Sequence, residues 1–129
     1  MDSIDDCRIS CRFVRSVTER EKLRQRLEDL EDFKDKICRA LNYVCESKAR
    51  YSCLQCYDDE AHDYVTTECK TSCESGYVRY SYCFELNNDY ILNIIAEKPS
   101  DVIIVTFYPF HSSDLKTLKN KCDNIINPI

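Results

Sequence analysis

Ten cysteines in a chain of 129 residues constrain this sequence more than any other feature. They are accompanied by a single glycine and three prolines, whereas small disulfide-stabilised proteins are usually rich in loops. The opening residues 1–6 are acidic and lack the apolar stretch of a signal peptide. In a reducing compartment, clustered cysteines are more often metal ligands than disulfides. The sequence therefore predicts an intracellular protein that folds around zinc, with disulfides or buried thiols as the alternatives.

The central cysteines have the spacing of a metal site. Cys53 and Cys56 form a C-x2-C pair, and Cys69 and Cys73 form a C-x3-C pair after twelve intervening residues. Two thiolates at such a spacing can hold one face of a tetrahedral ion, and a second pair closes the site. A closed site of four thiolates is structural rather than catalytic. We therefore predict Zn²⁺ as the cofactor, with these four cysteines as its ligands.

Further potential ligands surround this motif, and together with the central four they would suffice for two zinc ions. They are Cys38, Cys45, His62 and Cys83. Cys38 and Cys45 lie on a predicted helix and can equally be packed thiols, whereas His62 lies in an acidic loop where a histidine is usually exposed. Small buried hydrophobic positions are expected for the remaining cysteines, Cys7, Cys11 and Cys122.

The segment 38–85 resembles the RING/U-box-like cysteine-rich proteins that act in nucleocapsid assembly of baculoviruses. The resemblance lies in the number of potential ligands, the size of the segment and the helix that precedes it. It implies two cross-braced zinc ions that hold a small β-hairpin and a helix together. It also implies a viral protein of the host cytoplasm or nucleus, or of the virion, with a ubiquitin-ligase module as the enzymatic alternative.

Residues 14–47 are predicted to form one long amphipathic helix, because no glycine or proline interrupts them. Apolar residues recur in this segment with the seven-residue spacing of a coiled-coil seam. Two interpretations are open: the seam packs on the protein's own core, or it contacts another structural protein or a second copy of the chain. The predicted partner-binding residues are Leu23, Leu27, Leu30, Ile37, Leu41 and Val44.

Charge is distributed unevenly along the chain, whose formal net charge is −5. The first part contains an arginine stripe, whereas residues 51–129 hold twice as many acidic as basic side chains. Because phosphate binding needs clustered cations, a nucleic-acid coat is not favoured, and a zinc-finger regulator that binds nucleic acid is an alternative. Its contacts would come from Arg8, Arg12, Arg15, Arg20 and Arg24. No segment has the length and apolar content of a membrane span.

After Gly76 the pattern becomes that of β-strands. Residues 77–86 and 90–96 are rich in aromatic and β-branched side chains, and the turn signal Asn87-Asn88-Asp89 separates them. A nearly continuous apolar run over residues 102–107 predicts a buried strand. A closing helix is expected from Ser112 or Ser113 to Ile126.

These elements predict a single α+β domain over residues 1–129. It comprises the long helix at 14–47, a zinc-binding segment at 51–84, and a small antiparallel sheet with a closing helix at 77–129. A single glycine leaves no phosphate-binding loop, and Cys53 lacks the preceding strand of a thioredoxin-like motif. The sequence therefore predicts a non-enzymatic protein that acts through protein–protein contacts in a larger assembly.

Overall fold

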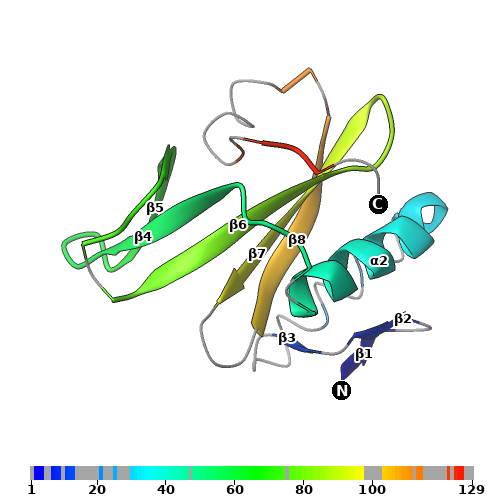
Figure 1. Ribbon diagram of the computed structural model, residues 1–129, viewed down its shortest axis with the longest axis horizontal. Coiled ribbons are helices and arrows are strands. Elements are labelled where there is room, and N and C mark those ends of the chain that lie inside the picture. Colours follow the sequence, from blue (N-terminus) through cyan, green and yellow to red (C-terminus); the bar gives the residue numbers. More distant parts are fainter. Residues whose placement is uncertain are drawn as a thin grey trace.

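A computed structural model describes residues 2–4, 7–9, 11–13, 21, 25, 30–46, 48–74, 76–97, 103–111, 113–114, 122 and 124–126. In this part the chain is mainly β (Figure 1). The elements, in chain order, are β1 (Asp2–Ile4), β2 (Cys7–Ile9), β3 (Arg12–Phe13), the 3₁₀ helix η1 (Glu31–Phe33), α2 (Lys34–Cys45), β4 (Cys53–Asp58), β5 (Asp63–Lys70), β6 (Val78–Glu85), β7 (Tyr90–Glu97) and β8 (Ile103–His111).

One curved sheet organises the fold. Its strand order is β3-β8-β7-β6-β4-β5, and β1 and β2 form a separate antiparallel pair. Neighbouring strands of the main sheet are antiparallel except β3 and β8, which are parallel. Figure 1 shows α2 at one end of the sheet and the β4–β5 hairpin at the other. The hairpin therefore extends away from the helix-covered part of the molecule.

The predicted hairpin of the C-terminal half is present as β6 and β7. The side-chain oxygen of Asn87 accepts hydrogen bonds from the backbone N–H groups of Asp89 and Tyr90, each 2.8 Å long. Asparagine favours turns because its side chain can replace a backbone partner in this way. A strand was predicted at 102–107. The observed strand, β8, is longer, because it pairs with β7 as far as His111.

The main core lies between α2 and one face of the sheet. Ile37, Leu41 and Val44 have no exposed surface, and their spacing places them on one face of the helix. They pack against a set of buried sheet residues that includes Phe84, Leu92, Ile94 and Phe107. The described part of the seven-residue stripe, residues 30–44, therefore belongs to the protein's own core, and the predicted coiled coil is wrong.

The predicted long helix is also wrong, and the α+β class with it. The backbone of Leu30 has φ −111° and ψ 34°, which is outside the helical region, so a helix over 14–47 is broken at this residue. Glu21 and Gln25 are helical, and after the break the described helical segment is η1 followed by the twelve residues of α2. Neither of these two helical elements, within the described part, is long and apolar enough to cross a membrane.

The predicted closing helix does not reach Ile126, because this residue joins the sheet. Its N–H group donates to the carbonyl of Cys83 at 2.8 Å, and its carbonyl accepts from the N–H group of Glu85 at 3.0 Å. Ile126 thereby forms a β-bridge with Phe84. The N–H and C=O groups of Ile126 therefore find their hydrogen-bond partners in the sheet, and not within a helix. Residues 115–121 of the predicted helix lie outside the described residues.

Candidate functional site

Most cysteines of the described part are joined in disulfides. The bonded pairs are Cys11–Cys45, Cys56–Cys73 and Cys83–Cys122, and Cys38 is also disulfide-bonded. Cys53 and Cys69 carry thiols. Among the described residues, no group of three or more histidine, cysteine or acidic side chains is placed to hold a metal ion. The predicted zinc is therefore wrong, because a sulfur in a disulfide has no thiolate to offer.

The predicted ligands are distributed over several parts of the fold. Cys38 and Cys45 lie on α2, and Cys45 ties the end of this helix to Cys11. Cys83 alternates in β6 with Tyr82 and Phe84, which belong to the core below α2, so it lies on the opposite face of the sheet. Its disulfide to Cys122 holds the C-terminal segment on that face.

His62 is exposed in the turn between β4 and β5, as the loop interpretation expected. Its φ of 54° places it in the left-handed region, which tight turns use. The same turn is fixed by Asp58, whose Oδ1 accepts from the N–H group of Glu60 at 2.9 Å. The position of His62 is thus explained by the geometry of the turn.

The four central cysteines lie on an arm formed by β4, β5 and the segment that leads into β6 (the arm, residues 53–79). β4 pairs with β6 in regular register, from Cys53 opposite Ser81 to Cys56 opposite Val78. Its pairing with β5 is irregular between Leu54 and Cys56. A disulfide between Cys56 and Cys73, whose Cα atoms are 5.5 Å apart, ties β4 to the segment after β5. The arm is therefore held together by hydrogen bonds and a covalent cross-link.

Three tyrosines and an arginine contact one another on the arm (the tyrosine patch: Tyr57, Tyr64, Tyr77 and Arg79). The ring centroid of Tyr57 lies 5.3 Å from that of Tyr64 and 6.0 Å from that of Tyr77, both edge-on. The guanidinium carbon of Arg79 lies 4.0 Å from the Tyr64 centroid, a cation–π distance. Tyr77 is 70% exposed.

The tyrosine patch faces away from α2. Arg79 and Tyr80 are neighbours in β6 and therefore point to opposite faces of the sheet. Tyr80 packs against the core below α2, so Arg79 lies on the other face. Glu97 of β7 holds the Arg79 side chain there, with Nε and Oε1 3.4 Å apart. The Arg79 side chain thus contacts both Glu97 and the ring of Tyr64.

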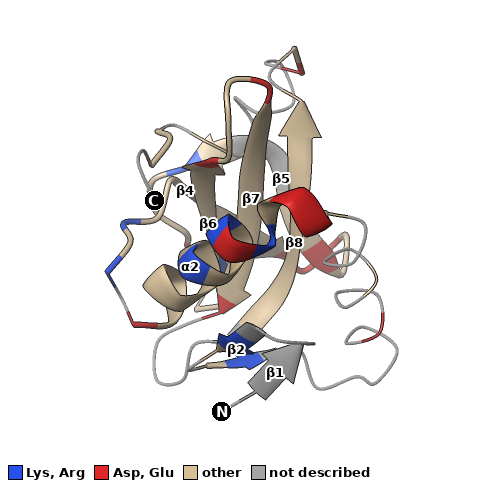
Figure 2. Ribbon diagram, turned by 90° about the vertical axis from the view of Figure 1, so that its right-hand side faces the viewer, with Lys and Arg blue, Asp and Glu red and all other residues tan. Residues whose placement is uncertain are grey.

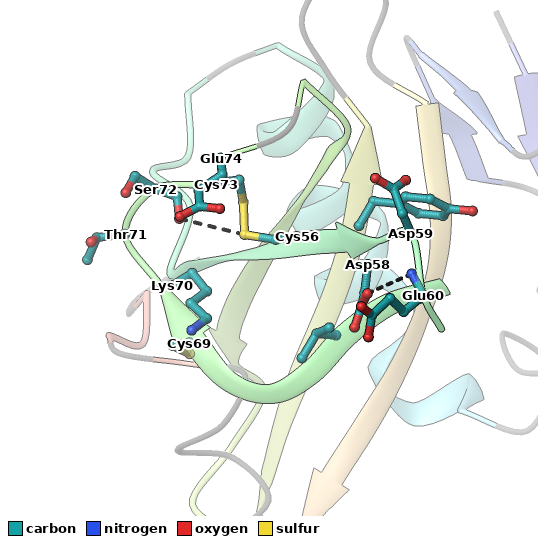
Figure 3. Close-up of a pocket in the computed structure, with 12 residues that line it drawn as sticks. Cys56, Asp58, Asp59, Glu60, Cys69, Lys70, Thr71, Ser72, Cys73 and Glu74 are labelled. Atoms are coloured by element: carbon teal, nitrogen blue, oxygen red, sulfur yellow. Dashed lines mark hydrogen bonds between the residues drawn. A yellow bond between two sulfur atoms is a disulfide. The ribbon is translucent and has the colours of Figure 1, made fainter. Parts of the chain in front are cut away.

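An open hollow of about 1030 Å³ lies beside the patch on the same arm (Figure 3). Its described lining contains four carboxylates, those of Asp58, Asp59, Glu60 and Glu74, and one ammonium group, that of Lys70. Cys69 and the Cys56–Cys73 disulfide also line it. The hollow therefore has an acidic rim and a sulfur-rich wall.

Further cationic residues lie at the other end of the molecule from the arm. Figure 2 shows basic residues on α2 and β2, which lie at the end of the sheet remote from β5 in Figure 1. Of the predicted arginine stripe, Arg8 and Arg12 are exposed, and its other members lie outside the described residues. Binding of nucleic acid through this stripe stays a prediction.

No protein family model matches this chain, and no curated protein or solved structure is significantly similar to it. The resemblance to baculovirus assembly proteins therefore stays a prediction. The candidate site rests on the geometry of the arm.

The structure gives the burial of most of the predicted partner-binding residues. Ile37, Leu41 and Val44 are buried, Leu30 is half-buried, and Leu23 and Leu27 lie outside the described residues. The tyrosine patch was missed because its members are far apart in the sequence and meet only when β4, β5 and β6 pair. One signal was present: six of the nine tyrosines fall within residues 51–82.

Proposed function

We propose that this protein is a binding module whose arm contacts a partner protein. The observation that carries the proposal is the tyrosine patch, in which an exposed Tyr77 extends a cluster of two further tyrosines and Arg79. Tyrosine and arginine are enriched among the residues that dominate the binding energy of protein interfaces. A surface of this composition, away from the core, favours contact with a protein.

The arm is suited to binding because its side chains are already ordered. The rings of Tyr57 and Tyr64 contact each other, and Arg79 is fixed between Tyr64 and Glu97. The Cys56–Cys73 disulfide restrains the backbone behind them. Little conformational entropy is then lost on association, which raises affinity for a given contact area.

The partner that the arm fits is an extended, positively charged segment of a protein. Four carboxylates surround the hollow against one lysine, so a cationic chain is electrostatically complementary. β5 is the last strand in the order of the described sheet, and strands in this position accept an extended segment by backbone pairing. Tyr64 of the patch lies on β5 itself, so the patch adjoins this strand. A role in a larger assembly follows from this proposal when the partner is a structural protein.

The test uses a dye-labelled twelve-residue peptide of alternating lysine and threonine, with a glutamate–threonine peptide as the matched probe of opposite charge. Fluorescence anisotropy should show binding of the lysine peptide alone. Tyr77→Ala should weaken this binding about tenfold, because each tenfold change in Kd corresponds to roughly 1.4 kcal/mol and interface tyrosines commonly contribute that much.

Tyr90→Ala provides the matched control, since Tyr90 is also exposed but lies at the opposite end of β7 from the arm. It should leave the affinity for the lysine peptide unchanged. Equal binding of both peptides, or equal losses in the Tyr77 and Tyr90 variants, would contradict the proposal.

A further inference from the structure

The hollow on the arm contains a thiol and a disulfide together. Cys69, at the end of β5, lines the hollow with both cysteines of the Cys56–Cys73 bond (Figure 3). All three residues are half-buried, so reagents in solvent can reach them. The other described thiol, that of Cys53, is 2% exposed and is not part of the lining. Cys69 therefore differs from Cys53 in two ways: it lies beside a disulfide, and solvent can reach it.

We propose that this hollow is a site of thiol–disulfide exchange. The thiolate of Cys69 attacks Sγ of Cys56, the Cys56–Cys73 bond breaks, and a Cys56–Cys69 bond forms while Cys73 leaves as a thiolate. One disulfide is consumed and one is formed, so the step needs no external oxidant or reductant. Exchange reactions of this kind proceed through the thiolate and require access to the disulfide sulfur.

The register of the arm indicates why Cys56 is the sulfur attacked. Leu54 lies opposite Lys70, and Cys56 lies opposite Val65, so β5 contains three more residues than β4 between these two pairs. Cys69 belongs to this irregular stretch. The extra backbone gives β5 the length to move Cys69 toward Cys56 while the pairing at Asp58 and Asp63 is kept.

The leaving cysteine lies on the rim of the hollow. Cys73 follows Thr71 and Ser72 and precedes Glu74, and these three neighbours are exposed. Exchange therefore moves a thiol from the wall of the hollow to its rim, where a larger molecule can approach. The Cys73 thiolate can then attack a disulfide of the form RS–SR, forming Cys73–S–SR and releasing RS⁻. The class of substrate is a disulfide flanked by positive charge, because carboxylates surround the rim.

The first experiment follows the position of the thiol. Protein incubated at pH 8 is labelled with iodoacetamide, quenched in acid and mapped by mass spectrometry without reduction. We expect label on Cys73 as well as Cys69 in the wild type, and a Cys56–Cys69 peptide in the chains labelled at Cys73. Cys69→Ser should abolish the label on Cys73.

Cys53→Ala is the matched control, because it removes the other described thiol but leaves the hollow intact. It should retain the label on Cys73, and so should Tyr77→Ala, which tests the peptide-binding proposal alone. Wild-type label confined to Cys69, or label on Cys73 that persists in Cys69→Ser, would overturn the exchange. Cys69→Ala repeats the test with a second side chain, and circular dichroism verifies that each variant is folded.

The second experiment tests the charge of the substrate. Cystamine, a cationic disulfide, and the disulfide of 2-mercaptoethanesulfonate, an anionic one, are each added to the wild type, and the mixed disulfide at Cys73 is quantified. Cystamine should react about tenfold faster at low ionic strength, and the difference should shrink in high salt because exposed charges are screened. Equal rates for the two reagents, or a faster reaction of the anionic one, would overturn the assigned substrate class.

Discussion

Tyr82 shows how one side chain links the core to pH. It lies in β6 with no exposed surface, in the core below α2. Burial raises the pKa of its hydroxyl above the ordinary value of 10, and the nearby Tyr80 and Tyr51 add to this effect. The phenol is therefore still protonated in the folded protein at a pH where the unfolded chain ionises. Its contribution to stability is complete below pH 10 and is lost as the pH rises above it.

We expect the free energy of unfolding to fall by about 1.4 kcal/mol between pH 8 and pH 11 through this single group. Tyr82→Phe should remove that part of the pH dependence, because phenylalanine has no proton to lose. Urea unfolding at the two pH values measures it, in a Cys69→Ser background that removes the half-exposed thiol. The same pH dependence in both proteins would show that Tyr82 ionises freely in the folded state.

At the level of elements, α2 shows both the strength and the limit of sequence reasoning. The apolar spacing correctly identified Ile37, Leu41 and Val44 as one helical face. It could not decide what that face contacts, because a stripe that fits a coiled coil also fits a sheet. It also could not locate the break at Leu30, where the backbone leaves the helical region although the side chain fits the seam.

The strands also differ in how far they could be predicted from the sequence. β6 and β7 were predictable because alternation and the turn at Asn87 are local signals. β4 and β5 were not predictable, because the disulfide between Cys56 and Cys73 and the pairing of β4 with β6 join residues that are distant in the sequence. The tyrosine patch depends on those same pairings, so it could not be located before the strands were.

Leu41→Ala should lower the free energy of unfolding by about 2–5 kcal/mol, the usual range for truncating a buried leucine. Leu41 is fully buried between α2 and the sheet, so the substitution leaves a cavity. Arg39→Ala, on the exposed side of the same helix, should change stability by less than about 0.5 kcal/mol. Urea unfolding compares the two variants, and similar losses in both would contradict the packing of α2 on the sheet.

On the scale of the whole molecule, the cysteines connect segments that are distant in sequence. Cys11–Cys45 spans 34 residues and Cys83–Cys122 spans 39, so these partners cannot be deduced from local spacing. The C-x2-C and C-x3-C pairs suggested zinc, but cysteines that form disulfides can have the same spacing. The fold decides between zinc binding and disulfide formation, because it pairs Cys56 with Cys73 and leaves Cys53 in the interior. Disulfides of this span stabilise a fold mainly by restricting the unfolded chain.

The most direct test of this account is a map of the disulfides in the native protein. Rapid alkylation, followed by an acid quench and digestion without reduction, identifies thiols and linked peptides in one measurement. We expect linked peptides for Cys11–Cys45, Cys56–Cys73 and Cys83–Cys122, and a thiol at Cys69. Alkylation of Cys56, Cys69 and Cys73 together, with no linked peptide from the arm, would contradict the covalent arrangement on which both proposals depend.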